Sequence, residues 1–95
     1  MARPSDTPIP APDVLALMAL AHVAGDESLG PRFLALTGMD AGDLRARAGE
    51  PDVLAAVLQF LAAHDADLMA AATALGTTPA HLAAAARTLA GDWDA

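Results

Sequence analysis

Residues 12–24 of the 95-residue chain read PDVLALMALAHVA, and this stretch decides the fold. Pro12 suits the first turn of a helix, Asp13 favours the positive end of the helix dipole, and Gly25 is typical of a stop after the last turn. At about 100° per residue, the large apolar side chains point all round the helix axis. They are Val14, Leu15, Leu17, Met18, Leu20 and Val23. Such a helix must be covered on every side, by this chain or by a second molecule.

Two short helices are predicted to follow. The first opens at Ser28, with Pro31 in its first turn. Asp40 is expected to cap the second, with Asp43 three residues later as a weaker form of the capping box. Their predicted ends are Gly38 and Gly49.

The clearest amphipathic helix is predicted for residues 51–63, where Pro51 and Asp52 form the start. Its large apolar residues fall within an arc of roughly 160°. They are Val53, Leu54, Val57, Leu58, Phe60 and Leu61. The opposite side is predicted to carry Ala55, Ala56, Gln59, Ala62 and Ala63. This helix and residues 12–24 are expected to form the core.

Two C-terminal helices are expected to cross as a helix-turn-helix-like pair over residues 66–90. Asp65 is predicted to cap the first, Gly76 to turn the chain, and Thr78 to cap the second, which ends at Gly91. The predicted core residues of the pair are Leu68, Ala71, Ala72, Leu75, Leu82, Ala85, Ala86 and Leu89. Small residues at the crossing allow two helices to approach closely.

The same pair offers an alternative function, a DNA-binding regulator whose second helix enters a groove. The side chains that would contact nucleic acid are Thr78, His81 and Arg87. The charge of the chain opposes this use, because 12 acids against 5 arginines and no lysine give a formal net charge of −7. Binding to nucleic acid depends on Lys and Arg that neutralise phosphates. The sequence therefore favours a packing role for the turn, and nucleic acid is not the expected partner.

Three arginines, Arg32, Arg45 and Arg47, lie close together in the two short helices and are candidates for a partner-binding patch. A local positive patch on an acidic protein would suit an anion or an acidic partner. The alternative is that these side chains are ordinary surface arginines, paired with nearby acids and worth little to stability. The acids considered for that pairing are Asp40, Asp43 and Glu50.

No residue pattern predicts catalysis or a cofactor. The chain has no Cys, which excludes disulfides and thiolate sites. His22, His64 and His81 lack the spacing of metal ligands, and His22 is expected to be partly buried with a backbone partner. The sequence contains no glycine-rich phosphate loop, nucleophile elbow or zinc-protease motif. We therefore expect no catalytic, cofactor-binding or metal residue, no small-molecule substrate, and a protein that is not an enzyme.

These expectations combine into an all-α, compact single-domain bundle of five or six short helices. Residues 1–11, rich in Pro, Ser, Asp and Thr, are predicted to be a flexible leader, residues 12–91 the helical domain, and residues 92–95 a tail in which Trp93 folds back over a helix end. The leader lacks the apolar run of a signal peptide, and the longest uncharged apolar stretch is about half of a membrane span. A cytoplasmic protein without a membrane segment is expected.

Several stretches of the chain resemble a known family over Val14 to Trp93. They are LALMAL at 15–20, RFLALTGM at 32–39, DLR at 43–45 and VLAAVLQFL at 53–61. This set is similar to short bacterial proteins of the domain of unknown function 3572 family, apart from Gln59, where an acid is expected, and His64, where a polar or acidic residue is expected. The resemblance implies a small, cytoplasmic, bacterial protein and supplies no activity or site residue.

The function predicted from the residues is a non-enzymatic protein-interaction or regulatory module. The reason is the segment 12–24, which has more apolar directions than a chain of this size easily covers. The expected partner is another protein or a second copy of the chain. The DNA-binding regulator stays as the alternative.

Overall fold

The described part of the chain, residues 10–94 of a computed structural model, is built from six helices and contains no strand. Side chains are described up to Gly91. The helices are α1 (Pro12–Ala24), α2 (Leu29–Thr37), α3 (Ala41–Ala46), α4 (Pro51–Ala62), α5 (Asp65–Leu75) and α6 (Pro79–Asp94). The all-α fold predicted from the sequence is confirmed. The predicted leader before Pro10 and the predicted position of the Trp93 side chain lie outside these described residues.

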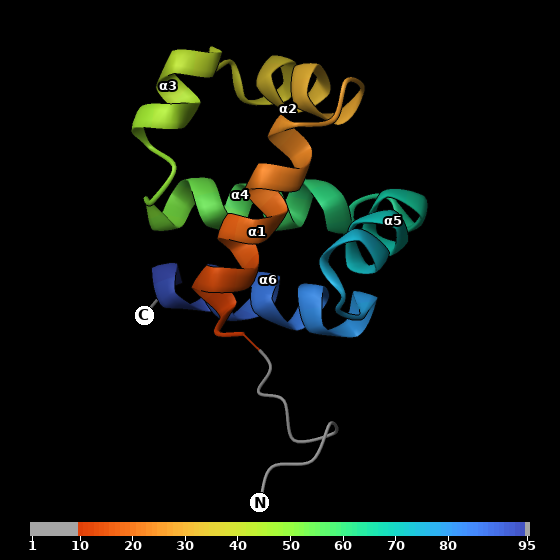
Figure 1. Cartoon of the computed structure of the whole chain (residues 1–95). Coiled ribbons are helices and arrows are strands. Elements are labelled where there is room, and N and C mark those ends of the chain that lie inside the picture. Colours follow the sequence, from red (N-terminus) through yellow and green to blue (C-terminus); the bar gives the residue numbers. More distant parts are fainter. Residues whose placement is uncertain (1–9, 95) are drawn as a thin grey trace, which may run out of the picture.

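Helices α4 and α6 run in opposite directions, and α1 crosses in front of both (Figure 1). The predicted core of α1 and α4 is therefore confirmed, with α6 as a third member. The side chains that are most completely buried come from four helices: Val23, Phe33, Val57, Leu58, Leu61 and Leu82. On α6 the predicted face of Leu82, Ala85, Ala86 and Leu89 is buried throughout. Its alanines leave room for the neighbouring helices to pack closely.

Within this chain α1 is covered on one side only. Its buried residues are Leu15, Ala16, Ala19, Leu20 and Val23. Val14 and Leu17 are 45% and 44% exposed. The prediction that α1 is covered all round therefore fails for Val14 and Leu17 as far as this chain is concerned. The physical reason is that α4 and α6 both pack against the same side of α1.

Helix α4 is buried more widely than its sequence pattern predicted. All six of the predicted apolar residues are buried, and so is Ala55, which was assigned to the outer side. Because α1, α5 and α6 all contact α4, the covered arc extends beyond the large side chains. The small Ala55 side chain fits where a helix approaches closely.

Some predicted helix ends are wrong. Helix α5 already begins at Asp65, and His64 occupies the N-cap position without a side-chain cap bond. Helix α3 ends at Ala46 and does not reach Gly49. Helix α6 continues to Asp94, past the glycine predicted to end it. A single glycine inside a helix costs only about 1 kcal/mol, which the rest of a long helix can offset.

Within residues 10–94, no single helix is both long enough and apolar enough to cross a bilayer. Helices α4 and α5 reach those limits only when taken together, and they bend by 115° at their junction.

The turn between α5 and α6 depends on Gly76. This residue has φ of 70°, in the left-handed region that only glycine adopts without strain. The backbone N–H of Thr77 then donates to the carbonyl of Ala72 at 2.9 Å, which closes the end of α5. Thr78 begins α6 as predicted, because its Oγ1 accepts the backbone N–H of His81 at 3.1 Å.

The core assignment predicts a large difference between two truncations. Leu58 is 1% exposed, so Leu58→Ala should lower the free energy of unfolding by about 2 to 5 kcal/mol. Arg45 is exposed, so Arg45→Ala should change it by less than about 0.5 kcal/mol. Denaturant titration of both variants measures this, and the opposite ranking would show that the buried face of α4 is misassigned.

A pair of glycine substitutions should have opposite effects. Gly76→Ala places a side chain at positive φ and should destabilise the protein by about 1 to 2 kcal/mol. Gly91 lies inside α6 with open space around it, so Gly91→Ala should stabilise by about 0.5 to 1 kcal/mol. Chemical denaturation of the two variants beside the natural chain gives the signs. A stabilising Gly76→Ala would rule out the left-handed turn.

Candidate functional site

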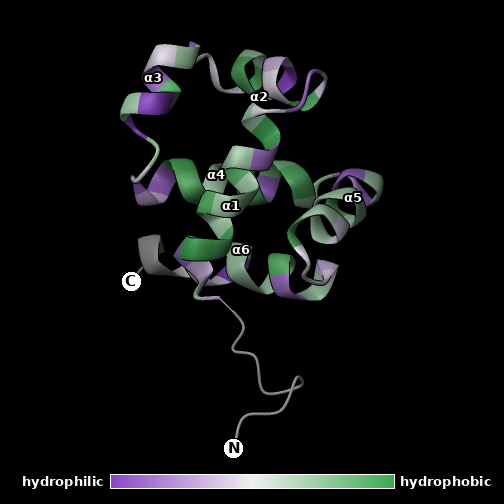
Figure 2. Cartoon of the chain, viewed as in Figure 1, coloured by the Kyte–Doolittle hydropathy of each residue, from purple (hydrophilic) through white to green (hydrophobic). Residues whose placement is uncertain are grey.

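Beyond Asp13 in the first turn, the outward face of α1 consists of apolar side chains. Val14, Leu17, Ala21 and Ala24 are all exposed, and their spacing of three or four residues places them along one side of the helix. Figure 2 shows hydrophobic colouring along most of α1. An exposed helix face usually carries polar residues, so this face is the first candidate for a binding surface.

An apolar cavity of about 470 Å³ adjoins this face, between α1, α2 and α3. We call it the α1–α3 groove. The residues that line it are Leu17, Leu20, Ala21, Ala24, Gly30, Pro31, Leu34, Ala41, Leu44, Arg45 and Ala48. Leu17 thus belongs both to the open face of α1 and to the groove. The groove lies at the α2 and α3 end of the molecule, opposite the end where both termini emerge (Figure 1).

Helix α2 is placed against α1 by Gly30. A Cβ atom at this position would lie 3.1 Å from the carbonyl oxygen of Val23 and 3.4 Å from that of Ala24. The backbone of α2 therefore packs directly on the last turn of α1, where a larger residue would push it away. This close approach sets the wall that α2 contributes to the groove.

Asp26 begins α2. Its Oδ1 accepts the backbone N–H groups of Ser28 and Leu29, each at 2.8 Å. The side chain of Ser28, which occupies the N-cap position, makes no such bond. These hydrogen bonds, that from Leu29 first and that from Ser28 second, hold the pKa of the Asp26 carboxyl below its ordinary value. A carboxylate at this place also interacts favourably with the positive end of the α2 helix dipole.

Helix α3 begins with the predicted capping box. Asp40 Oδ1 accepts the backbone N–H of Asp43 at 2.8 Å, and Asp43 Oδ2 accepts that of Asp40 at 3.5 Å. One large side chain, Leu44, is buried and anchors the helix to the rest of the protein. The same face of α3 turns Ala41, Arg45 and, just beyond the helix, Ala48 toward the groove.

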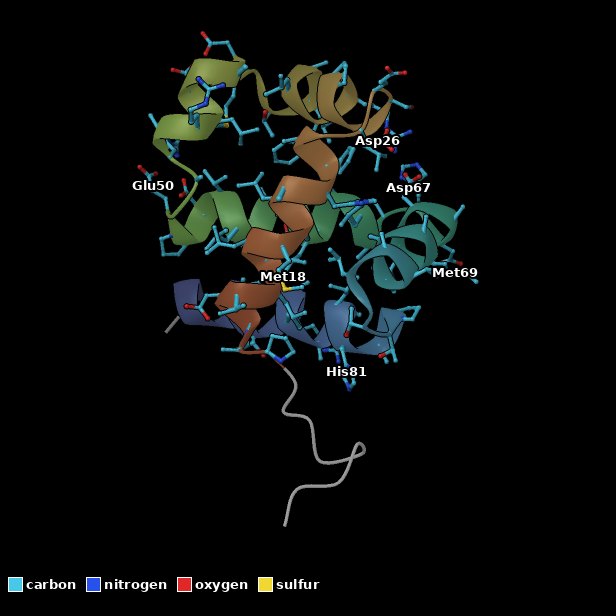
Figure 3. All side chains as sticks on the ribbon, in the orientation of Figure 1. Met18, Asp26, Glu50, Asp67, Met69 and His81 are labelled. Atoms are coloured by element: carbon cyan, nitrogen blue, oxygen red, sulfur yellow. The ribbon has the colours of Figure 1, made fainter. Side chains whose placement is uncertain are left out.

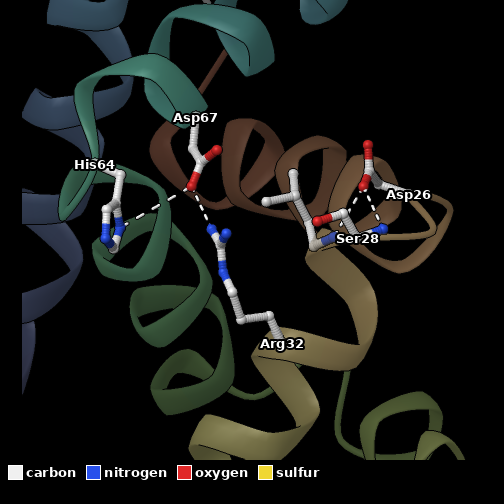
Figure 4. Close-up of polar contacts among 6 residues, drawn as sticks. Asp26, Ser28, Arg32, His64 and Asp67 are labelled. Carbon is white, nitrogen blue, oxygen red and sulfur yellow. Dashed lines mark hydrogen bonds and ion pairs between the residues drawn. The ribbon is translucent and has the colours of Figure 1, made fainter.

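Arg32 connects three helices. Its guanidinium forms an ion pair with Asp67 of α5 and lies 5.1 Å from the ring centre of Phe60 on α4. Figure 4 shows Asp67 between Arg32 and His64, whose Nδ1 is 4.0 Å from the Asp67 carboxylate. Phe60 also packs edge-on against Phe33, with ring centres 5.2 Å apart. This arrangement gives Arg32 a structural use within the chain.

The other two predicted arginines have different surroundings. Arg47 bonds Glu50 at 2.9 Å and Asp52 at 2.6 Å, and the hydrogen bond to Glu50 raises the pKa of Arg47 above its ordinary value. Arg45 is exposed on the groove, and no acid among the described residues lies within ion-pair distance of it. The three arginines therefore do not form one patch, and Arg45 is the one of the three without an acid within ion-pair distance among the described residues.

The residues predicted for nucleic-acid contact lie on α6 or just before it. Thr78 is occupied as the cap of α6, and His81 is partly buried with its Nδ1 3.4 Å from Oγ1 of Thr77. Figure 3 shows His81 near the start of α6, below the core. Arg87 is exposed on the same helix.

Titratable groups do not gather into a reactive cluster in the described part. No group of three His, Asp or Glu residues lies close enough to hold a metal ion there. His22 is partly buried, as predicted, but its Nε2 is enclosed without a hydrogen-bond partner among the described residues.

Two other cavities are weaker candidates for a binding site. One, of about 790 Å³, lies between α1, α4 and α6 at the end where the termini emerge. A third, of about 400 Å³, lies between α2 and α4 and is bordered by the arginine that pairs with Asp67. The α1–α3 groove shares Leu17 with the cavity between α1, α4 and α6, but it differs from both cavities in its Arg45, which has no acid within ion-pair distance among the described residues.

The lowered pKa of Asp26 predicts a pH-dependent contribution to stability. Its stabilising effect is complete above the unfolded pKa of about 4 and is lost as pH falls through the lower folded pKa. Asp26→Asn keeps an acceptor oxygen but removes the charge, so the variant should melt below the natural chain at pH 7, and the difference should shrink in strong acid. Thermal melts from pH 7 to pH 2, with Glu27→Gln as the control, measure this. An equal difference at every pH would contradict the assignment.

Comparison with known proteins places the chain by its sequence. No curated protein and no solved structure matches it. A family model described as "Protein of unknown function (DUF3572)" matches residues 10–92, and this range contains every residue of the α1 face and the groove. The family predicted from the sequence is therefore confirmed. With nearly its whole length matched, the chain belongs to the DUF3572 family of proteins of unknown function.

Proposed function

We propose that this chain is a non-enzymatic protein-interaction module whose binding surface is the open face of α1 together with the α1–α3 groove. The observation that carries the proposal is the exposure of Val14 and Leu17 on a helix whose outward side, beyond Asp13 in its first turn, is apolar. Water-exposed apolar faces of this kind are typical of surfaces that another protein covers. The adjoining groove adds depth, into which partner side chains can insert.

The net charge of the chain also supports a surface that binds one partner and not other proteins at random. The chain carries a formal net charge of −7, which keeps an apolar face from causing indiscriminate self-association. A protein with a hydrophobic content of 55% needs such protection in solution. The partner must therefore recognise the face by shape and apolar contact.

The DNA-binding alternative has weaker support. The second helix of the α5–α6 pair offers one exposed arginine, Arg87, while Thr78 is engaged as a cap. Sequence-specific DNA binders make several phosphate contacts with Lys and Arg. The interaction module is the better proposal.

The proposal predicts that one exposed leucine controls partner binding. Leu17→Ser should weaken binding of a protein captured from the source organism by about tenfold or more. The reason is that a small polar side chain replaces the exposed apolar side chain of Leu17 in the interface. Met69→Ser is the matched control, since Met69 is 59% exposed and points away from the groove on α5 (Figure 3). Quantitative mass spectrometry of proteins retained by each variant is the readout.

Two outcomes would contradict the proposal. Equal retention by the natural chain and both variants would show that the α1 face takes no part in binding. A shift of random duplex DNA at low salt, where phosphate attraction is strongest, that Arg87→Ala abolishes would favour the DNA-binding alternative.

A further inference from the structure

The α1–α3 groove has the form of a seat for one helix. Two helical stripes border it, each with the spacing i, i+3, i+4, i+7. On α1 the stripe is Leu17, Leu20, Ala21 and Ala24. On and just after α3 it is Ala41, Leu44, Arg45 and Ala48. Opposed stripes with this period match the ridge of a third helix that carries apolar side chains at the same spacing.

Small residues in the lining allow the backbone of a partner helix to enter the groove. Ala21, Ala24, Gly30, Ala41 and Ala48 supply much of the lining. Such residues let a partner helix approach closely, and the large side chains must then come from the partner. Leu20 and Leu44 are the large side chains of the lining that are buried.

Part of the groove lining is open to solvent. Leu17, Ala21, Ala24 and Pro31 line it and are all exposed to solvent. Small-molecule sites commonly enclose about 70 to 90% of the ligand surface. An occupant here would keep one side in water, as an amphipathic helix does.

Charge identifies the occupant further. Arg45 is the one charged residue among those that line the groove, and it has no acid within ion-pair distance in the described part of the chain. An Asp or Glu beside the apolar ridge of the partner would pair with this guanidinium. A second copy is a poor occupant, because two chains with a net charge of −7 repel each other.

We propose that the α1–α3 groove binds one amphipathic helix of a different protein, with apolar side chains at i, i+3 or i+4, and i+7 in the groove and one carboxylate paired with Arg45. This inference rests on the proposed function, because it names the partner chemistry of the same surface. The rest of the partner helix is neutral or basic, since the chain as a whole repels acids.

A selection of random peptides on the immobilised full chain tests this directly. The natural chain should enrich peptides with the helical apolar period and an adjacent Asp or Glu. Arg45→Glu should enrich the same period with Lys or Arg in place of the acid, and Leu17→Ser should enrich neither. Arg45 is exposed, so Arg45→Glu should fold normally, and Arg45→Gln serves as a neutral second variant.

Binding of a selected peptide then measures the ion pair. Its Glu form should bind the natural chain about two- to fivefold more tightly than its Gln form, and the order should reverse on Arg45→Glu. The preference should weaken as salt is raised, since exposed ion pairs are screened.

The outcomes separate the two proposals. If the natural chain and Arg45→Glu both enrich peptides with the helical apolar period and the same charge preference, the pairing with Arg45 is wrong. The interaction surface itself is not contradicted by that result. If the selection yields no peptide whose enrichment depends on Leu17, the groove is not a helix-binding site. The capture experiment with Leu17→Ser still decides the proposed function in that case. A dimer of the natural chain in sedimentation, dissociated by Leu17→Ser, would make a second copy the occupant and overturn the proposal.

Discussion

The structure depends on the packing of one side of α1 against α4 and α6. Ala16, Ala19 and Val23 are all 0% exposed, so the small side chains of α1 let the other two helices approach it closely. Burial of apolar surface is the main term that offsets the entropy of ordering a chain of this size. Because this contact uses one side of α1, the other side is left in water.

That arrangement explains why the apolar face and the groove occur together. Helix α2 continues from the end of α1 and is pressed against it at Gly30, and α3 returns along the far side of the groove. Asp26 and the Asp40–Asp43 capping box fix where these two helices begin. The groove is thus bounded by elements with defined starts, while its lining stays apolar apart from Arg45.

Most of the helices follow from local signals in the sequence. Pro12, Asp40, Pro51, Thr78 and the left-handed Gly76 mark boundaries through covalent geometry and capping, which do not depend on the rest of the fold. The prediction that the last helix ends at Gly91 is wrong, because a glycine inside a helix costs only a modest amount of stability.

The site was less predictable, because burial and pairing are decided by tertiary contacts. The sequence pattern showed that α1 is apolar all round, but which side stays open depends on where α4 and α6 pack. Arg32, Arg45 and Arg47 looked alike in the sequence. Their partners, Asp67 for one and Glu50 with Asp52 for another, depend on the packing of α2, α4 and α5. The period of Ala41, Leu44, Arg45 and Ala48 was visible in the sequence and could have indicated the groove.

We propose that the outward face of α1 is open in the isolated chain and is covered by a partner protein in the cell. The chain has no Cys, so a single Cys at position 17 can report on this face by its rate of thiol labelling. We expect Leu17→Cys to react as fast as Met69→Cys in the purified protein, and only Leu17→Cys to become protected when both variants are labelled inside cells of the source organism. Protection of Leu17→Cys in the purified monomer, or equal reactivity of both positions inside cells, would contradict it.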